Sequence, residues 1–186
     1  MSFLRTSLIV FLCLFTGASI AANEKAIFSL TFGDFSEELE DAKDEGKKGV
    51  LLFFEMKECP FCHRMKTTVL NQPEVISYFK KHMSVFSVDI EGDVLMTDFA
   101  GNEMKMKDFA FKHNRVRATP VFAFYDLTGK KVVKYTGPTS GVEETMWLAE
   151  YFINEEYKKQ RFTKFKKAKR AEKKRLKKLK KDKKVN

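Results

Sequence analysis

The hydrophobic positions of the chain form strand-like runs that alternate with stretches of helical spacing. Five consecutive apolar residues, 50–54, are too few for a helix and show no polar alternation, so they predict a strand buried on both faces. Further on, Met65, Val69 and Leu70 recur at helical spacing and predict a helix that begins close to Cys59. The strongest pattern is therefore a buried strand followed directly by a helix.

A second helix and a second strand follow this pair. The sequence Asn71-Gln72-Pro73 interrupts the first helix, and the apolar residues within 75–79 predict a second helix that runs to about His82. Residues 85–90 alternate between two faces and predict a strand. Because a helix connects the two strands, we expect a β-α-β unit with parallel pairing.

The segment before this unit predicts one strand and one helix. Residues 27–32 predict a short leading strand. Asp34 or Ser36 then caps a helix that ends near Gly46.

The segment after the unit predicts a hairpin or loop, an antiparallel pair of strands and two helices. Residues 98–103 predict a hairpin or loop, which leads to a helix over 107–114. A turn that contains glycine joins two strands, 116–125 and 132–135, which predicts an antiparallel hairpin. A last helix begins near Val142. The order β-α-β-α-β-β-α predicts an α/β fold in which helices flank a central mixed sheet.

Length and composition suit one domain with additions at both ends. The chain has 186 residues, of which 44% are hydrophobic and 19 are Phe, enough for a sizeable core. Residues 1–22 combine one early charge, an apolar run and small residues at the end, which is typical of a secretory signal peptide. An uncleaved membrane anchor is less favoured, because the apolar run is shorter than the ~20 residues that span a bilayer. We predict a signal peptide (1–22), a domain (23–156) and a basic tail (157–186).

The basic tail carries the positive charge of the chain. It holds 17 Lys and Arg against two acidic residues, so its net charge is +15, whereas the residues before it sum to −5. Beyond Phe165 its apolar residues are too sparse to define a core-facing stripe, which predicts an extended helix or a disordered arm. The tail is interpreted either as a solvated extension or as a segment that binds an anionic membrane surface or an acidic partner. Nucleic acid is the least favoured partner.

The chain has three cysteines, and Cys13 lies within the predicted signal peptide. The other two, Cys59 and Cys62, form a C-x-x-C pair, so an exported chain has no further cysteines for a disulfide framework. At a helix start, free N–H groups and the helix dipole stabilise a thiolate, and Pro60 suits the first turn because it has no N–H. We predict that Cys59 attacks a disulfide and that Cys62 resolves the mixed disulfide.

Other interpretations of the pair are open. With His63, the pair matches the C-x-x-C-H of c-type haem attachment, although haem attachment needs no buried strand before the cysteines. A zinc site needs four ligands, and only Cys59, Cys62 and His63 lie close together in the sequence. We favour a redox pair that needs no cofactor, with haem, a metal or an inert pair as alternatives.

Residues 27–155 resemble the thioredoxin superfamily. The resemblance rests on a strand, then Cys59-Pro60-Phe61-Cys62, then a helix; on Thr119-Pro120 at the opening of a later strand; and on a glycine past the last strand. Each feature alone is common in proteins, but the three together in this order are specific to the thioredoxin superfamily. The resemblance implies that Pro120 is a cis proline facing the cysteines, and that Thr119 offers backbone groups to a bound substrate strand.

Within the superfamily, two groups are similar to this chain. The sequence Asp98-Phe99-Ala100-Gly101, a helix and then Val116-Arg117-Ala118-Thr119-Pro120 resembles exported thioredoxins of the SoxW type. Cys62-His63 and Thr119-Pro120 are also similar to periplasmic disulfide isomerases.

Two positions depart from the usual thioredoxin pattern. Thioredoxins usually carry Trp before the first Cys, where this chain has Glu58, and a buried acid six residues before it, where this chain has Phe53. Glu55, on the same face of the strand, is a candidate replacement for that acid. The charge of Glu58 opposes a thiolate on Cys59, whereas an imidazolium at His63 favours it. Glu55, Glu58 and His63 are therefore candidates for tuning the ionisation of the thiol.

These features predict an exported thiol-disulfide oxidoreductase that exchanges disulfides with protein substrates, in the reducing direction, and depends on an upstream electron donor. The periplasm is the favoured compartment, with the extracellular space or the lumen of the endoplasmic reticulum as alternatives. A second hypothesis is a redox-inactive adaptor, in which the thioredoxin-like core docks a partner while the basic tail binds a polyanion.

Overall fold

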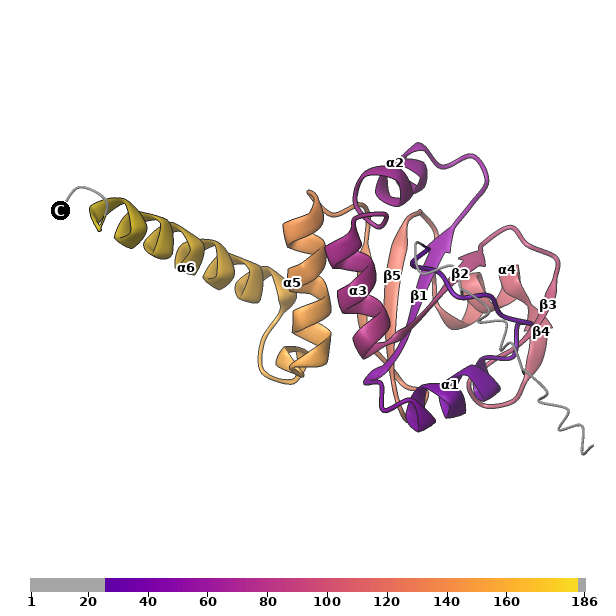
Figure 1. The fold of residues 1–186 in the computed structure, drawn as a ribbon. Helices are drawn as coiled ribbons and strands as arrows, with labels where there is room; N and C mark the ends of the chain where they lie inside the picture. Colours follow the sequence, from indigo (N-terminus) through magenta and orange to yellow (C-terminus); the bar gives the residue numbers. More distant parts are fainter. Residues whose placement is uncertain (1–25, 184–186) are drawn as a thin grey trace, which may run out of the picture.

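The computed structural model describes residues 26–183, so the predicted signal peptide (1–22) lies outside the described residues. Helices and strands alternate along the chain (Figure 1). The strands are β1 (Gly49–Glu55), β2 (Ser84–Asp89), β3 (Leu95–Thr97), β4 (Glu103–Lys105), β5 (Val121–Asp126) and β6 (Lys131–Thr136). The helices are α1 (Phe35–Asp44), α2 (Pro60–Thr68), α3 (Pro73–His82), α4 (Met106–Asp108), the π-helix η1 (Phe109–His113), α5 (Val142–Ile153), the 3-10 helix η2 (Glu156–Lys158) and α6 (Phe162–Asp182).

Four strands form the central sheet in the order β2-β1-β5-β6. β1 pairs in parallel with β2, where Leu52 lies opposite Phe86, and antiparallel with β5, where Leu52 lies opposite Ala123. β5 and β6 are antiparallel, so the sheet is mixed, as predicted. β3 and β4 form a separate antiparallel hairpin, which confirms the hairpin predicted between β2 and the next helix.

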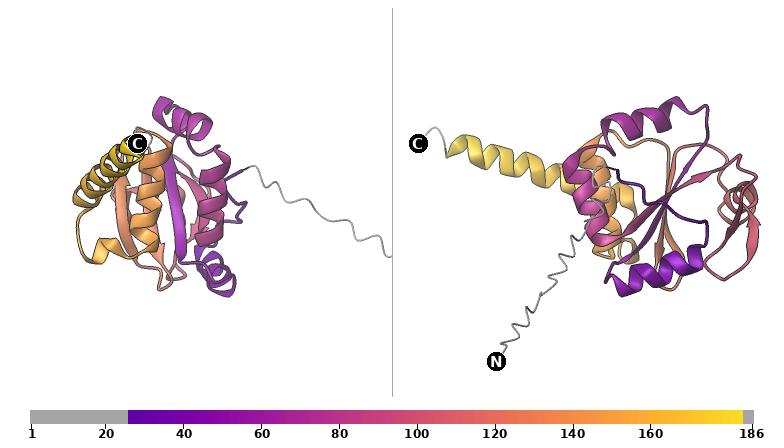
Figure 2. Two further views of the ribbon diagram at one scale, coloured as in Figure 1. Left: turned by 60° about the vertical axis from the view of Figure 1, so that its left-hand side comes forward. Right: turned by 45° about the vertical axis from the view of Figure 1, so that its right-hand side comes forward.

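Helices cover both faces of the sheet (Figures 1 and 2). Successive residues of a strand point to opposite faces. Leu51 and Phe53 therefore join one core cluster, with α2, α3 and α5. Val50, Leu52 and Phe54 join a second cluster, with α1 and η1. All five side chains are buried, which confirms a strand covered on both faces.

Three helices begin where the sequence predicts. Asp34 is the N-cap of α1, and its carboxylate accepts hydrogen bonds from the N–H groups of Ser36 (2.9 Å) and Glu37 (3.1 Å). α2 begins at Pro60 and α3 at Pro73. Each start is marked locally, because a carboxylate accepts otherwise unpaired N–H groups and a proline has none to pair.

The leading strand predicted over 27–32 is wrong. One backbone hydrogen bond, from the N–H of Ser29 to the carbonyl of Val85 (2.8 Å), links this segment to β2. Leu30 and Phe32 are fully exposed, so their side chains add no apolar burial that would hold the segment against the sheet. The segment is an irregular connection that leads to α1.

The strand predicted over 116–125 begins later, at Val121. The N–H of Val116 donates to the carbonyl of Ala110 (2.9 Å), a residue of η1, and so it is not free to pair with a neighbouring strand. The helix predicted over 107–114 is present as α4 followed by η1.

The basic tail forms α6, whose first turns pack on the domain and whose remainder projects from it (Figures 1 and 2). Phe162 and Phe165 lie against Tyr151 of α5, with ring centroids 5.4 and 5.5 Å apart respectively. Phe165 belongs to the core cluster on that face. Among residues 26–183, no helix is both long enough and apolar enough to cross a membrane.

A buried carboxylate, Glu144 of α5, joins α6 to the sheet. It is 3% exposed and accepts hydrogen bonds from the side chains of Tyr135 (3.0 Å), Ser140 (2.6 Å) and Lys166 (2.7 Å). Burial opposes ionisation, but the donors outweigh it and hold the pKa of Glu144 below its ordinary value. Burial and the hydrogen bond to Glu144 raise the pKa of Tyr135 to about 12.

Replacing Glu144 with glutamine is expected to lower the free energy of unfolding by about 1–2 kcal/mol at neutral pH, because its donors lose a charged acceptor. Since the folded pKa lies below the ordinary 4.5, this stabilisation is complete above about pH 4.5 and is lost as the pH falls through the folded pKa. Urea denaturation at neutral and acid pH measures the difference. A gap between wild type and variant that stays constant on acidification would contradict the prediction. Glu143→Gln, which removes an exposed pair with Lys173, is the control and should cost less than about 1 kcal/mol.

Candidate active site

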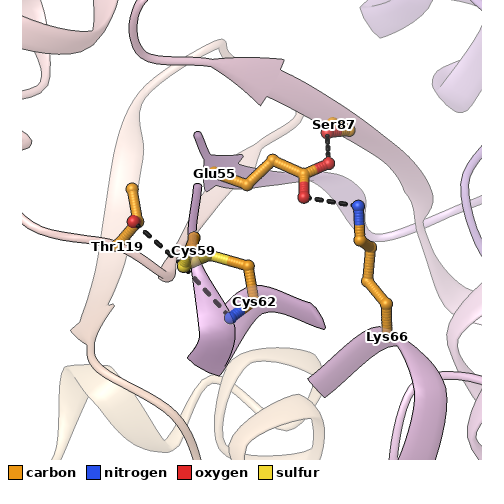
Figure 3. Close-up of a disulfide and its surroundings, with 6 residues drawn as sticks. All are labelled: Glu55, Cys59, Cys62, Lys66, Ser87 and Thr119. Carbon is orange, nitrogen blue, oxygen red and sulfur yellow. Dashed lines mark hydrogen bonds and ion pairs between the residues drawn. A yellow bond between two sulfur atoms is a disulfide. The ribbon is translucent and has the colours of Figure 1, made fainter. Parts of the chain in front are cut away.

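The cysteine pair lies at the junction between β1 and α2 (Figure 3). Cys59 is the N-cap of α2, and its Sγ accepts a hydrogen bond from the backbone N–H of Cys62 (3.1 Å). The two sulfurs form a disulfide, with the Cα atoms 5.2 Å apart. Pro60 occupies the first turn, where its missing N–H leaves no donor unpaired. The prediction that Cys59 stands at the beginning of a helix is confirmed.

The two cysteines differ in their access to solvent. Cys59 is 7% exposed and Cys62 is 1% exposed, with Cys62 one turn inside the helix on its core face beside Met65. An incoming disulfide would therefore reach Cys59 first, at the free N–H groups of the helix N-terminus. This asymmetry favours Cys59 as the attacking sulfur and Cys62 as the resolving one.

Thr119, in the segment just before β5, faces the cysteine pair. The hydroxyl of Thr119 donates a hydrogen bond to the Sγ of Cys59 (3.2 Å) (Figure 3). The peptide bond between Thr119 and Pro120 is cis, as the resemblance implies. The N–H of Gly137 donates to the carbonyl of Pro120 (2.8 Å), which ties this segment to the end of β6. The residues come together although 60 positions separate Thr119 from Cys59.

A cavity of about 330 Å³ lies on the other side of the pair, and Glu55 is among the residues that line it. The Glu55 carboxylate accepts a hydrogen bond from the hydroxyl of Ser87 (2.5 Å) and pairs with the Nζ of Lys66 (2.6 Å). Figure 3 shows Thr119 on one side of the disulfide and Glu55, Ser87 and Lys66 on the other. The candidate acid therefore lies in a cavity that both cysteines also line.

Sequence reasoning did not identify Lys66 and Ser87 as partners of Glu55. Lys66 lies four residues after Cys62, so the two share a face of α2, and this spacing was an available signal. Ser87 lies on β2 opposite Phe53 of β1, and only the parallel register brings its hydroxyl beside Glu55. Ser87 could therefore not be assigned before the pairing of β1 and β2 was known.

The other candidates for tuning the thiol lie at the surface. His63 is exposed and lines the cavity, whereas Glu58 is exposed and is not among the lining residues. Phe53, at the position of the usual buried acid, is fully buried in the core. Among residues 26–183, no group of three or more His, Cys, Asp or Glu residues is placed to hold a metal ion.

The family model of the thioredoxin-like domain matches residues 35–153, most of the chain. The chain belongs to the thioredoxin-like family. Its fold is similar to that of a thioredoxin-fold protein from Helicobacter pylori, with a TM-score of 0.63 and 24% identity over 83% of this chain and 96% of that one. It is also similar to the DsbH oxidoreductase, with a TM-score of 0.51 and 19% identity over 72% of this chain and 90% of that one. No curated protein sequence matches the chain.

These structural likenesses, all below 25% identity, concern the fold. The thioredoxin-like domain of this chain carries the close pair Cys59–Cys62 at the N-terminus of α2. The family match also agrees with the mixed sheet flanked by helices that the hydrophobic pattern predicts.

Proposed function

We propose that the protein is an exported thiol-disulfide oxidoreductase that reduces disulfides in other proteins, and that it resembles the SoxW-type thioredoxins in this role. The observation that carries the proposal is the arrangement around Cys59. Cys59 lies at the N-terminus of α2 and is the more exposed residue of the pair, and the Thr119 hydroxyl donates a hydrogen bond to its sulfur at 3.2 Å. A substrate strand that lies along the start of β5 would bring its disulfide to this sulfur.

The reaction is a balanced exchange of two electrons. The Cys59 thiolate attacks one sulfur of the substrate disulfide, and the other substrate sulfur leaves as a thiolate and takes a proton. Cys62, once deprotonated, attacks the Sγ of Cys59 and releases the second substrate thiolate, which is protonated in turn. The product on the protein is the Cys59–Cys62 disulfide. A dithiol donor then reduces this disulfide and is itself oxidised.

Export to the periplasm is part of the proposal. Its support is the sequence pattern of residues 1–22 and the use of both remaining cysteines in one C-x-x-C pair.

Reduction of insulin by dithiothreitol tests the proposed activity. Catalytic amounts of the protein are expected to shorten the lag before the insulin B chain precipitates, because the exchange at Cys59 is faster than the direct reaction of dithiothreitol. The turbidity at 650 nm measures this. An unchanged lag at all protein concentrations would overturn the proposal.

Glu55 is proposed as the group that accepts the proton of Cys62 in the resolving step. Its carboxylate lines the cavity together with Cys62, and Ser87 and Lys66 hold it in place. The Lys66 ammonium lies on the helix that carries both cysteines, so it orients the carboxylate relative to them. A carboxylate so placed can move one proton without leaving its site.

The Glu55→Gln variant is expected to resolve the mixed disulfide about 100-fold more slowly at neutral pH, because an amide cannot accept the proton. The deficit should shrink as the pH rises, since hydroxide then deprotonates Cys62 directly. Stopped-flow kinetics with a peptide disulfide over a range of pH measures this step, and alkylation of reduced Cys59 measures the attacking thiol separately. Glu58→Gln is the matched control. Equal rates for the Glu55 and Glu58 variants, or a deficit independent of pH, would contradict the role.

A redox-inactive adaptor is the second candidate, and the projecting helix α6 is the feature that favours it. In that case the double variant Cys59→Ser/Cys62→Ser would keep the function in the cell, and truncation of the chain after Tyr157 would abolish it. Haem attachment is disfavoured because the Cys62 side chain is 1% exposed and packs in the core, where a haem vinyl group has no access. A Soret band in the visible spectrum of the purified protein would reverse that conclusion.

A further inference from the structure

Helix α6 consists of a docked half and a free half. In the docked half, Phe162 and Phe165 pack on the domain, and the last ion pair to α5 joins Lys173 to Glu143 (2.6 Å). Every residue from 171 to 183 is exposed. In Figure 1 the C-terminal part of α6 projects away from α5 and from the rest of the domain. At a rise of 1.5 Å per residue, the free half of α6, residues 174–183, extends roughly 14 Å beyond this last ion pair.

The free half of α6 carries a dense positive charge. From Lys174 to Lys183 it holds seven Lys and Arg against Asp182. None of these seven cations forms an ion pair with any residue that the structure describes. Cations four residues apart, such as Lys174 with Lys178 and Lys177 with Lys181, repel one another on the helix surface. A helix of this length is marginal in water on its own, so contact with an anionic surface would stabilise it.

Two leucines continue the apolar stripe of the docked half. Leu176 and Leu179 lie 14 residues after Phe162 and Phe165, close to four helical turns, so all four share one face of α6. The phenylalanines pack on the domain, whereas Leu176 is 47% and Leu179 is 51% exposed. The stripe therefore extends beyond the surface that buries its first part. A partner that only neutralises charge would leave these leucines in water.

We propose that the free half of α6 binds the surface of an anionic phospholipid bilayer. Leu176 and Leu179 would enter the boundary between headgroups and acyl chains, while the flanking lysines reach back to the lipid phosphates. A lipid surface uses both features of this segment, since clustered cations add to the apolar contact. Duplex nucleic acid, by contrast, would use the cations and leave the leucines without a partner.

The inference does not depend on the redox activity of the cysteine pair, and the variants that test it leave the pair untouched. Full-length protein is mixed with vesicles of phosphatidylcholine alone and of phosphatidylcholine with phosphatidylglycerol, and the bound fraction is measured by sedimentation. The apolar residues of the N-terminal stretch are common to every variant. The difference in affinity between anionic and neutral vesicles therefore measures the charge-dependent part of the binding. We expect this difference to fall with added salt.

Two sets of variants test the charge and the apolar contact separately. The affinity for anionic vesicles is expected to fall by about 100-fold or more in the variant Lys174→Glu/Lys177→Glu/Lys178→Glu/Lys181→Glu. Leu176→Ser with Leu179→Ser is expected to lower it by about 10-fold. The matched control changes four exposed lysines outside α6 to glutamate: Lys48, Lys81, Lys112 and Lys130. This control should change the affinity by less than about threefold.

Several results would overturn the inference. They are an equal affinity of wild type for neutral and anionic vesicles, an equal loss in the control variant, an unchanged affinity in the leucine variant, or tighter binding to duplex DNA than to anionic vesicles at the same salt concentration. Insulin reduction measured on the same variants is expected to equal that of wild type. Loss of vesicle binding with full reductase activity would thus separate this inference from the proposed function.

Discussion

Replacing Cys59 with serine is expected to reduce the rate of insulin reduction to the background of dithiothreitol alone. A serine hydroxyl is not ionised at neutral pH and does not attack a disulfide, so no mixed disulfide forms. The nearly isosteric side chain keeps the N-cap position of α2, and its oxygen can still accept the N–H of Cys62. The loss should therefore be one of chemistry, with an unfolding midpoint in urea close to that of reduced wild type.

The Cys62→Ser variant is the informative counterpart. Cys59 remains able to attack, but no second thiol is present to release the substrate, so the variant is expected to accumulate as a covalent adduct with insulin or a peptide disulfide. Mass spectrometry under non-reducing conditions detects this adduct. The assignment of roles would be reversed if Cys59→Ser formed the stable adduct and Cys62→Ser did not.

Replacing Gly49 with alanine is expected to lower the free energy of unfolding by at least about 3 kcal/mol. Gly49 opens β1 opposite Asp126 of β5, with φ at +153°, a conformation that residues with a side chain rarely adopt. A Cβ at this position would overlap the carbonyl oxygen of Tyr125 and lie 2.9 Å from the ring of Phe152. Because the carbonyl belongs to the backbone of β5, β1 and β5 would have to separate where they meet.

Gly101→Ala is the matched control for this effect. Gly101 also has a positive φ, +83°, but a Cβ there would meet nothing within 4 Å. Its cost should be limited to backbone strain, about 1–2 kcal/mol. Urea denaturation followed by far-UV circular dichroism measures both variants. A loss in the Gly49 variant no larger than that of the Gly101 variant would show that the β1–β5 junction tolerates the added carbon.

Local patterns account for most of the fold and for the centre of the candidate site. The apolar run of β1, the cap at Asp34 and the prolines at 60 and 73 each act within a few residues of chain, and the structure bears out each of them. The same is true of Cys59, which stands at a helix start because strand and helix patterns meet there. Such features are visible in the sequence because capping and periodicity are short-range effects.

The predictions from sequence are wrong where contacts with a distant part of the chain determine the local structure. The pattern of residues 27–32 is compatible with a strand, yet the segment makes one backbone hydrogen bond to β2 and remains irregular. β5 begins at Val121 and not at Val116, because the N–H of Val116 donates its hydrogen bond to a carbonyl of η1. The docking of Phe165 of α6 depends on the surface of α5, which no pattern within the tail reveals. Glu144 of α5 is buried where Lys166 of α6 pairs with it.

The sequence by itself determined the α/β class, the order of the main elements and the position of the cysteine pair, because these follow from periodicity and capping within short segments. Only the tertiary structure decided which groups surround the sulfurs. Thr119 reaches Cys59 across 60 residues, and Ser87 reaches Glu55 across 32. These contacts depend on the pairing of β1 with β2 and β5, and a shift of one residue in that register would turn the side chains to the opposite face of the sheet.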